Sequence, residues 1–90
     1  MLITRPYNAE DNNINIEALK ILQHWALKNN EKILEARIYG GAVEIFTESG
    51  RNVYVSESQG CRSRYENVRS HLYMTEIKNN KRTRIKKEEW

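Results

Sequence analysis

The chain has 90 residues, a formal net charge of +3 and 39% hydrophobic residues. A chain of this length makes one domain at most, and a net charge this small does not oppose folding. The sequence contains no run of the roughly 18 apolar residues that a membrane-spanning helix needs. Cys61 is the single cysteine, which excludes an internal disulfide.

The beginning of the sequence gives no sign of export. Residues 1–13 lack the charged start and the long apolar run of a signal peptide. A lone cysteine also fits a reducing compartment. We therefore expect a cytoplasmic protein with no membrane partner.

Two elements are predicted in the first third of the chain. Residues 1–4 are apolar and precede Pro6, which cannot donate a ladder hydrogen bond, so we expect an edge strand that stops there. The stretch Ile14–Lys28 has apolar residues at helical spacing, which predicts an amphipathic helix. Asn29 and Asn30 can adopt the left-handed conformation that ends a helix.

The clearest pattern is a β-hairpin around Gly40-Gly41. Two glycines in a two-residue turn predict a primed turn, with positive φ at both positions. This turn would place Ile38 opposite Val43 on one face of the hairpin and Arg37 opposite Glu44 on the other. The turn chemistry and the apolar alternation therefore predict the same register.

A second turn is expected around Gly50. Val53 and Val55 stay on the face of Val43 only if the loop has an odd length, three or five residues, and we expect Thr47 opposite Val53. A left-handed glycine in a bulge is the expected device for such a loop.

Two alternatives remain open for the segment after the third strand. Ser63 and Glu66 have the spacing of a capping box, which favours a second helix over Arg64–Leu72. Residues 71–86 fit a hairpin equally well, with Asn79-Asn80 in its turn. We favour the helix as far as Leu72 and leave the following residues open.

Together these elements predict an α+β fold. We expect an antiparallel sheet of three or more strands, one long N-terminal helix packed on it and a second, shorter helix. Residues 1–77 should form a single compact domain, and residues 78–90 a basic C-terminal segment, either a strand or an ordered tail. Because a chain this short buries a modest core, a homodimer would be a natural supplement.

Positive charge is concentrated in the last third of the chain. Residues 1–61 hold 6 basic and 8 acidic residues, whereas residues 62–87 hold 9 basic and 2 acidic. Each phosphate that Lys or Arg neutralises releases condensed cations, which drives binding to nucleic acid. A solvated charged tail is the alternative. The predicted binding residues for nucleic acid or another partner are Arg62, Arg64, Arg69, Lys78, Lys81, Arg82, Arg84, Lys86 and Lys87.

A second candidate surface is the outer face of the predicted sheet. Its aromatic and basic members are Arg37, Tyr39, Phe46 and Tyr54, and its acidic members are Glu35, Glu44 and Glu48. Aromatic rings among charges resemble platforms that stack single-stranded bases, but three glutamates against one arginine disfavour phosphate. We therefore favour simple packing of the rings, with a protein-binding face as an alternative.

No motif indicates catalysis or a metal. His24 and His71 lie far apart in the sequence and no cysteine pair accompanies them, so no metal site is predicted. Glu44 and Glu48 lack the nearby lysine of a common nuclease pattern. We expect no cofactor and no enzymatic activity.

Three functions follow from these observations. The leading hypothesis is a small non-enzymatic regulator that binds nucleic acid, or a nucleic-acid-binding protein complex, through the basic residues. The alternative is a protein-binding inhibitor or adaptor, of the kind that phages and other mobile elements encode to block a host enzyme or defence complex. The short length and the Asn-, Ile- and Lys-rich composition, which is typical of an AT-rich genome, suit that alternative.

The segment Gly60–Tyr65 resembles a six-residue G-x-R-x-x-Y stretch of ribosome-dependent mRNA-cleaving toxins. This resemblance implies a small ribonuclease toxin as the third hypothesis.

Overall fold

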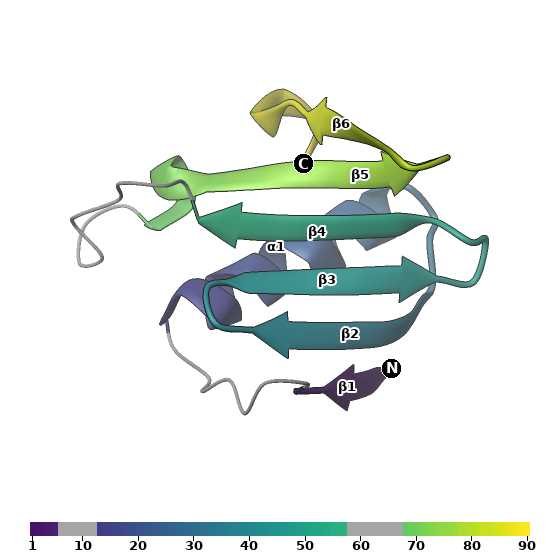
Figure 1. Ribbon diagram of the computed structural model, residues 1–90, viewed down its shortest axis with the longest axis horizontal. Coiled ribbons are helices and arrows are strands. Elements are labelled where there is room, and N and C mark those ends of the chain that lie inside the picture. The colour runs from purple at the N-terminus through teal and green to yellow at the C-terminus, as the bar shows by residue number, and fades with distance from the viewer. Residues whose placement is uncertain (6–12, 58–67) are drawn as a thin grey trace.

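The computed structural model describes residues 1–5, 13–57 and 68–90, and in them six strands form one sheet with a single α-helix across one face (Figure 1). Two short 3₁₀ helices, Val68–His71 and Lys87–Glu89, flank the last two strands. The helix is α1 (Asn13–Lys28), and the strands are β1 (Leu2–Thr4), β2 (Ile33–Tyr39), β3 (Ala42–Thr47), β4 (Asn52–Glu57), β5 (Leu72–Lys78) and β6 (Lys81–Ile85).

The strands lie in the sheet in the same order as in the chain. β1 pairs with β2 in parallel, and α1 connects these two strands, while every later pair is antiparallel. The predicted α+β class and the predicted edge strand are confirmed. The sheet is mostly antiparallel and not wholly so, because β1 and β2 are parallel. Parallel strands need a long connection, usually a helix, and α1 lies in this one.

The predicted second helix is wrong for the residues that the structure describes. Val68–His71 makes one 3₁₀ turn, and Leu72 already begins β5, where it pairs with Glu57 of β4. The alternation of β5 prevails over helical spacing because β4 offers a complete ladder of partners. The start of that predicted helix, Arg64–Asn67, lies outside the described residues, as does its capping box.

The alternative of a C-terminal hairpin is the one that forms. Asn79 and Asn80 both take positive φ, 53° and 62°, and Lys78 pairs with Lys81 across the turn. Positive φ at both central residues matches the twist of the flanking strands, and asparagine tolerates it better than most residues.

The first hairpin has the predicted register but not the predicted turn. Arg37 pairs with Glu44 and Ile38 with Val43. Only Gly41 takes positive φ, 93°, so the turn is not the primed one. The carbonyl of Gly41 accepts a hydrogen bond from the amide of Glu57 at 3.1 Å, which ties this turn to β4.

The second loop has the predicted odd length. The amide of Thr47 donates to the carbonyl of Arg51 at 2.9 Å, which leaves a three-residue loop with Gly50 in the left-handed conformation, φ 92°. Thr47 therefore lies opposite Arg51 instead of Val53, and Val53 pairs with Ile45. A register shift of two residues leaves every side chain on its predicted face, because strands repeat every two residues.

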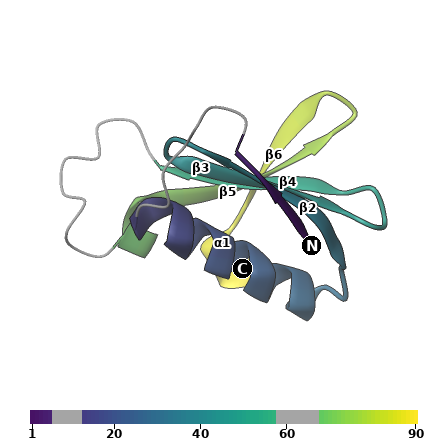
Figure 2. The ribbon, with the colours of Figure 1, turned by 90° about the horizontal axis from the view of Figure 1, so that it is seen from below.

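The core lies between α1 and one face of the sheet. Helical spacing and strand alternation both direct apolar side chains into this layer, as predicted. The buried residues are Ile14, Ala18, Ile21, Leu22, Trp25 and Ala26 of the helix and Ala36, Ile38, Val43, Ile45, Val53, Val55, Leu72 and Met74 of the strands. The opposite face of the sheet carries no helix among the described residues (Figure 2).

Helix α1 ends as predicted, with an asparagine in the left-handed conformation. Asn30 takes the left-handed conformation with φ 55°, and its amide donates to the carbonyl of Leu27 at 3.3 Å. The amide of Glu31 donates to the carbonyl of Ala26 at 2.8 Å. These two bonds form a Schellman motif, which satisfies carbonyls that the helix itself leaves unpaired.

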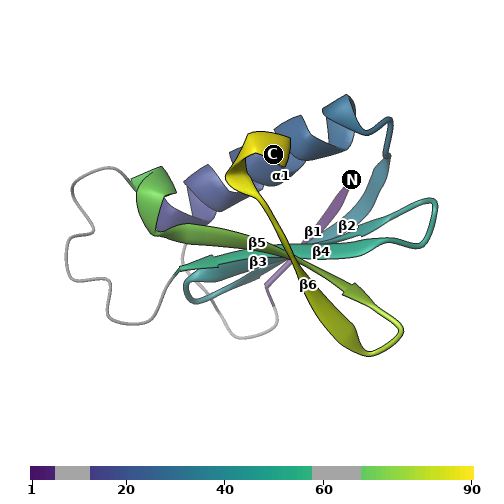
Figure 3. The same ribbon diagram turned by 90° about the horizontal axis from the view of Figure 1, so that it is seen from above.

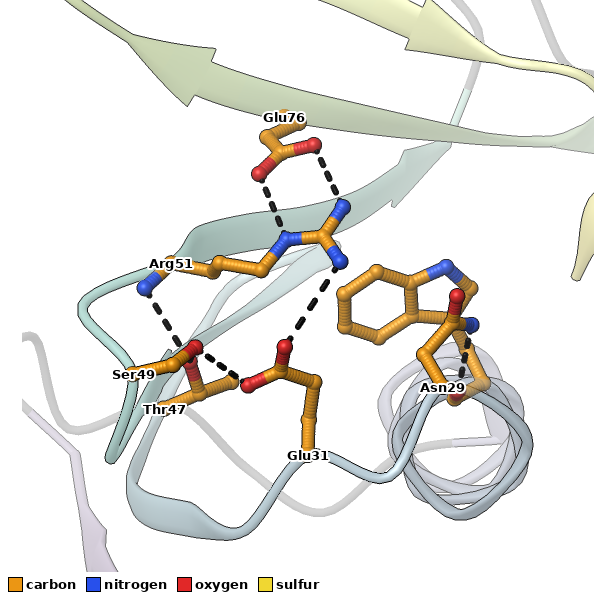
Figure 4. Close-up of polar contacts among 7 residues, drawn as sticks. Asn29, Glu31, Thr47, Ser49, Arg51 and Glu76 are labelled. Carbon is orange, nitrogen blue, oxygen red and sulfur yellow. Dashed lines mark hydrogen bonds and ion pairs between the residues drawn. The ribbon is translucent and has the colours of Figure 1, made fainter.

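An ion-pair cluster centred on Arg51 joins the loops at one end of the sheet (Figure 4). Its guanidinium donates twice to the Glu76 carboxylate, both at 2.8 Å, and its Nη1 lies 3.6 Å from Glu31 Oε2. The guanidinium carbon is 4.7 Å from the ring centroid of Trp25. Ser49 donates a short hydrogen bond to Glu31. One side chain thus connects the end of α1, the loop between β3 and β4, and β5.

The last residues return to the helix side of the sheet (Figure 3). Trp90 is 4% exposed, and its indole N–H donates to the carbonyl of Ile85 at 3.1 Å. Lys28 of α1 donates to the carbonyl of Trp90 at 3.4 Å. Trp90 is therefore part of the core.

Replacing Trp90 by Ala should destabilise the protein. Removing a large buried aromatic side chain leaves a cavity, and we expect a loss of about 3 kcal/mol in the free energy of unfolding. Leu27→Ala is the matched control, because Leu27 is 79% exposed on α1, and it should change this free energy by less than about 1 kcal/mol. Urea unfolding measures both. Equal stability of the two variants would mean that Trp90 does not dock.

Replacing Arg51 by Met should also destabilise the protein. The change leaves the Glu76 and Glu31 carboxylates without their cation, so we expect a loss of about 2 kcal/mol in the free energy of unfolding. Lys32→Met is the control, because Lys32 pairs with Glu48 at 3.7 Å on the exposed surface and such pairs contribute about 0.5 kcal/mol. A loss for Arg51→Met no larger than the control value would refute a role of the cluster in stability.

The cluster should make stability sensitive to acid. Hydrogen bonding from Arg51 lowers the pKa of Glu76 below its ordinary value of 4.5, and hydrogen bonding from Ser49 is the main cause that lowers the pKa of Glu31. A carboxyl group whose pKa is lowered by folding stabilises the folded protein at pH values above its unfolded-state pKa. This stabilisation is lost as the pH falls through its folded-state pKa. Unfolding between about pH 7 and about pH 3 should therefore show a weaker acid loss in Glu76→Gln than in the parent. An unchanged acid profile would contradict this.

Candidate functional site

The face of the sheet opposite α1, here called the open face, carries its side chains in three cross-strand rows. Residues directly opposite one another in neighbouring strands point to the same face. One row is Thr4, Arg37, Glu44, Tyr54, Thr75 and Arg84. The next is Leu2, Glu35, Phe46, Asn52, Ile77 and Arg82, and the last is Tyr39, Ala42, Ser56 and Tyr73.

The rows bring together the two surfaces that the sequence predicts separately. Arg82 and Arg84 come from the basic block, whereas Tyr54 and Phe46 come from the aromatic outer face. They meet because the turn at Asn79-Asn80 folds β6 back beside β5. Tyr73 joins this face as well, although the sequence does not predict it as a binding residue; its signal is the strand alternation around that same turn.

The remaining predicted basic residues occupy other places. Lys78 and Lys81 are exposed at the tip of the hairpin, and Lys86 is exposed just after β6. The guanidinium carbon of Arg69 is 4.9 Å from the ring centroid of Trp90, and Nζ of Lys87 is 5.8 Å from it. Both side chains therefore lie beside the buried C-terminal Trp90. Arg62 and Arg64 lie outside the described residues.

Two of the aromatic rings on the open face carry an arginine over them. The guanidinium carbon of Arg84 is 4.0 Å from the ring centroid of Tyr73, and that of Arg37 is 4.6 Å from the centroid of Phe46. The negative face of an aromatic ring attracts a guanidinium at this distance. The open face therefore presents arginine guanidinium groups as well as aromatic rings.

The carboxylates of the open face are engaged by neighbouring donors. Glu35 accepts from the hydroxyl of Thr4 at 3.1 Å and from Nε of Arg37 at 3.2 Å, and the bond from Arg37 is the main cause that lowers the pKa of Glu35. Glu44 accepts from the hydroxyl of Tyr39 at 2.9 Å and from the amide of Asn52 at 3.0 Å. The acidic groups of this face are thus held in place.

The charge balance of this face differs from the one that the sequence predicts. Glu48 lies in the turn after β3, where its carboxylate is 3.7 Å from Lys32, and it belongs to none of the paired rows. In the rows the structure describes, Glu35 and Glu44 oppose three arginines. The expected excess of glutamate, which disfavours phosphate, is therefore absent from these rows.

The open face is hollowed beside the C-terminal hairpin. The outer part of β5 and β6 bends to the side of the sheet away from α1 and forms a wall along the face (Figure 3). A hollow of about 190 Å³ lies there, and its lining residues are Tyr39, Ala42, Glu44, Tyr54, Ile77 and Arg82.

Larger hollows lie at the Arg51 end of the sheet, with volumes of about 440 and about 590 Å³. Arg51 and Glu76 line both of them. Because these two side chains already satisfy each other in the ion-pair cluster, we place the candidate site on the open face.

Neither a cluster of metal-ligating side chains nor a membrane-spanning helix occurs among the described residues. Over residues 1–5, 13–57 and 68–90, no three His, Cys, Asp or Glu side chains gather as metal ligands would. None of the helices in those ranges has the length and apolar character needed to cross a membrane.

Comparison of the chain with protein-family models, with curated proteins and with solved structures finds no match.

Proposed function

We propose that this protein binds nucleic acid through the open face and the basic hairpin that borders it. The observation that carries the proposal is the position of Arg82 and Arg84, which stand exposed on β6 beside the rings of Tyr54 and Tyr73. Cationic side chains for phosphate and flat groups for bases then lie on one surface.

The hairpin of β5 and β6 provides the positive charge for binding phosphate. Its exposed basic residues are Lys78, Lys81, Arg82 and Arg84. Glu76 is the acidic residue of these two strands, and Arg51 already neutralises it at 2.8 Å. The hairpin is therefore a local concentration of positive charge, and a phosphate chain that contacts it would release its condensed cations.

The central strands of the open face provide the aromatic surface for stacking on bases. Tyr54 lies at the centre of a row, between Glu44 and Thr75, and Tyr73 is 38% exposed. Aromatic rings and arginine planes both stack on bases, and stacking tolerates any base sequence. A sheet face that combines both is suited to a nucleic-acid strand.

A protein partner is the second candidate. Arginine and aromatic residues are also enriched in protein interfaces, and the Arg37–Phe46 and Arg84–Tyr73 pairs are of this kind. The protein would then act as a non-enzymatic inhibitor or adaptor that covers an acidic surface. The ribonuclease hypothesis depends on Gly60–Tyr65, which lie outside the described residues.

A salt titration of binding tests the proposal. In fluorescence-anisotropy titrations with labelled single-stranded and duplex oligonucleotides, affinity should fall steeply with salt. The double variant Arg82→Ala/Arg84→Ala should bind more weakly and reduce the slope of log K against log salt by about one unit for each lost contact.

The matched control is Lys20→Ala/Lys32→Ala, which removes the same charge from exposed positions on α1 and just before β2. Its salt slope should equal that of the parent. Equal losses in both double variants would show that net charge, and not this face, governs binding. A stoichiometric protein partner that survives nuclease treatment, with no oligonucleotide binding at low salt, would favour the inhibitor.

A further inference from the structure

The hollow on the open face combines groups that suit a planar ring. Tyr39 and Tyr54 contribute aromatic surface, and Ala42 and Ile77 contribute apolar surface. Glu44 is the acidic group of its lining and Arg82 the basic one. All five strands from β2 to β6 contribute to it, so the hollow exists only because the C-terminal hairpin closes one side of the face.

The size of the hollow limits which ligand can enter it. The volume is about 190 Å³, which is below the roughly 300 Å³ at which pockets for drug-sized ligands begin. A single planar heterocycle suits this space better than a whole nucleotide. The sugar and phosphate of an entering nucleotide would remain outside, where Arg82 is exposed on the wall.

Glu44 determines the polarity of the hollow. Its Oε1 accepts from Tyr39 and its Oε2 from Asn52, at 2.9 and 3.0 Å. An ionised carboxylate has about four acceptor positions, so each oxygen can accept one more hydrogen bond. Burial is the main cause that raises the pKa of Tyr39, followed by its hydrogen bond to Glu44, so this hydroxyl stays protonated and donates. A ligand at Glu44 must therefore bring N–H donors.

The bases differ in how well they meet this requirement. The pairing edge of guanine carries two adjacent donors, the ring N1–H and the exocyclic N2 amino group, which can reach both oxygens of one carboxylate. On cytosine and adenine an amino donor stands next to a ring-nitrogen acceptor, and on thymine the single N–H stands between two carbonyls. These acceptors would face the carboxylate and repel it.

We infer that this hollow is a guanine pocket for single-stranded nucleic acid, in which Glu44 accepts the N1–H and N2–H of the base and Tyr54 provides a stacking surface. The inference rests on the proposed function, since it names the nucleic acid that the open face takes. The pairing edge of guanine is occupied in a duplex, so the pocket selects an unpaired base. Arg82, on the wall of the hollow, contacts the phosphate backbone of the strand next to the bound guanine.

The test compares labelled oligo(dT) strands that carry one central dG, dI, dA, dC or dT. The dG strand should bind on the order of 10-fold more tightly than the dA, dC and dT strands. The dI strand lacks the N2 amino group and should lose much of that preference. Single-stranded dG should also bind more tightly than the same strand in a duplex.

Glu44→Gln should abolish the preference for dG without abolishing binding. The variant removes a negative charge from the open face, so its affinity for plain oligo(dT) should stay equal or rise. Glu35→Gln is the matched control, because Glu35 lies on the same face but does not line the hollow, and it should keep the preference. A variant that is merely misfolded would lose affinity for every strand, which thermal unfolding of each variant would reveal.

The outcomes separate the inference from the proposed function. Salt-dependent binding that is equal for all five strands, or a dG preference that survives in Glu44→Gln, would overturn the guanine pocket and leave nucleic-acid binding in place. Tighter binding to the duplex than to the single strand would overturn the pocket as well. No binding to any strand at low salt would overturn both.

Discussion

The ion pair between Arg51 and Glu76 holds together three parts of the fold at one end of the sheet. It connects the loop after β3 to β5, and through Glu31 it reaches the end of α1. Two parallel charged hydrogen bonds fix both distance and orientation, which a single contact does not. Among the described strands β6 pairs with β5 alone, so the position of the C-terminal hairpin depends on how β5 is held, by its ladder with β4 and by this ion pair.

The alternation of β5 gives the two faces of the sheet different chemistry. Glu76 points to the helix side, where Arg51 neutralises it, while Thr75 and Ile77 point to the open face and lie opposite the two arginines of β6. A one-residue shift of this strand would exchange the faces and set an acidic group among those arginines. The positive character of the open face is thus a consequence of register.

Much of the fold could be predicted because the responsible signals are local. The helix Asn13–Lys28 and its end at Asn30 follow from apolar spacing and capping residues, and the register of the first hairpin follows from strand alternation. The predicted second helix misleads at its end, because Leu72 fits both the helical spacing of the residues before it and the alternation of β5. The choice between them depends on pairing with β4, and a local pattern does not contain that partner. Of the candidate site, the sequence predicts Arg82 and Arg84 on one surface and Arg37, Tyr39, Phe46 and Tyr54 on another.

The sequence by itself determined the α+β class, the faces of the central strands and the concentration of basic residues in the last third of the chain. These properties depend on composition and on periods of two or about 3.6 residues, which are visible in any short window. Only the tertiary structure decided that the aromatic and basic surfaces are one, that Glu48 lies in a turn outside the paired rows and that Trp90 docks on the helix side. Each of these depends on which strand lies beside which, and strand order arises from contacts between segments distant in the chain.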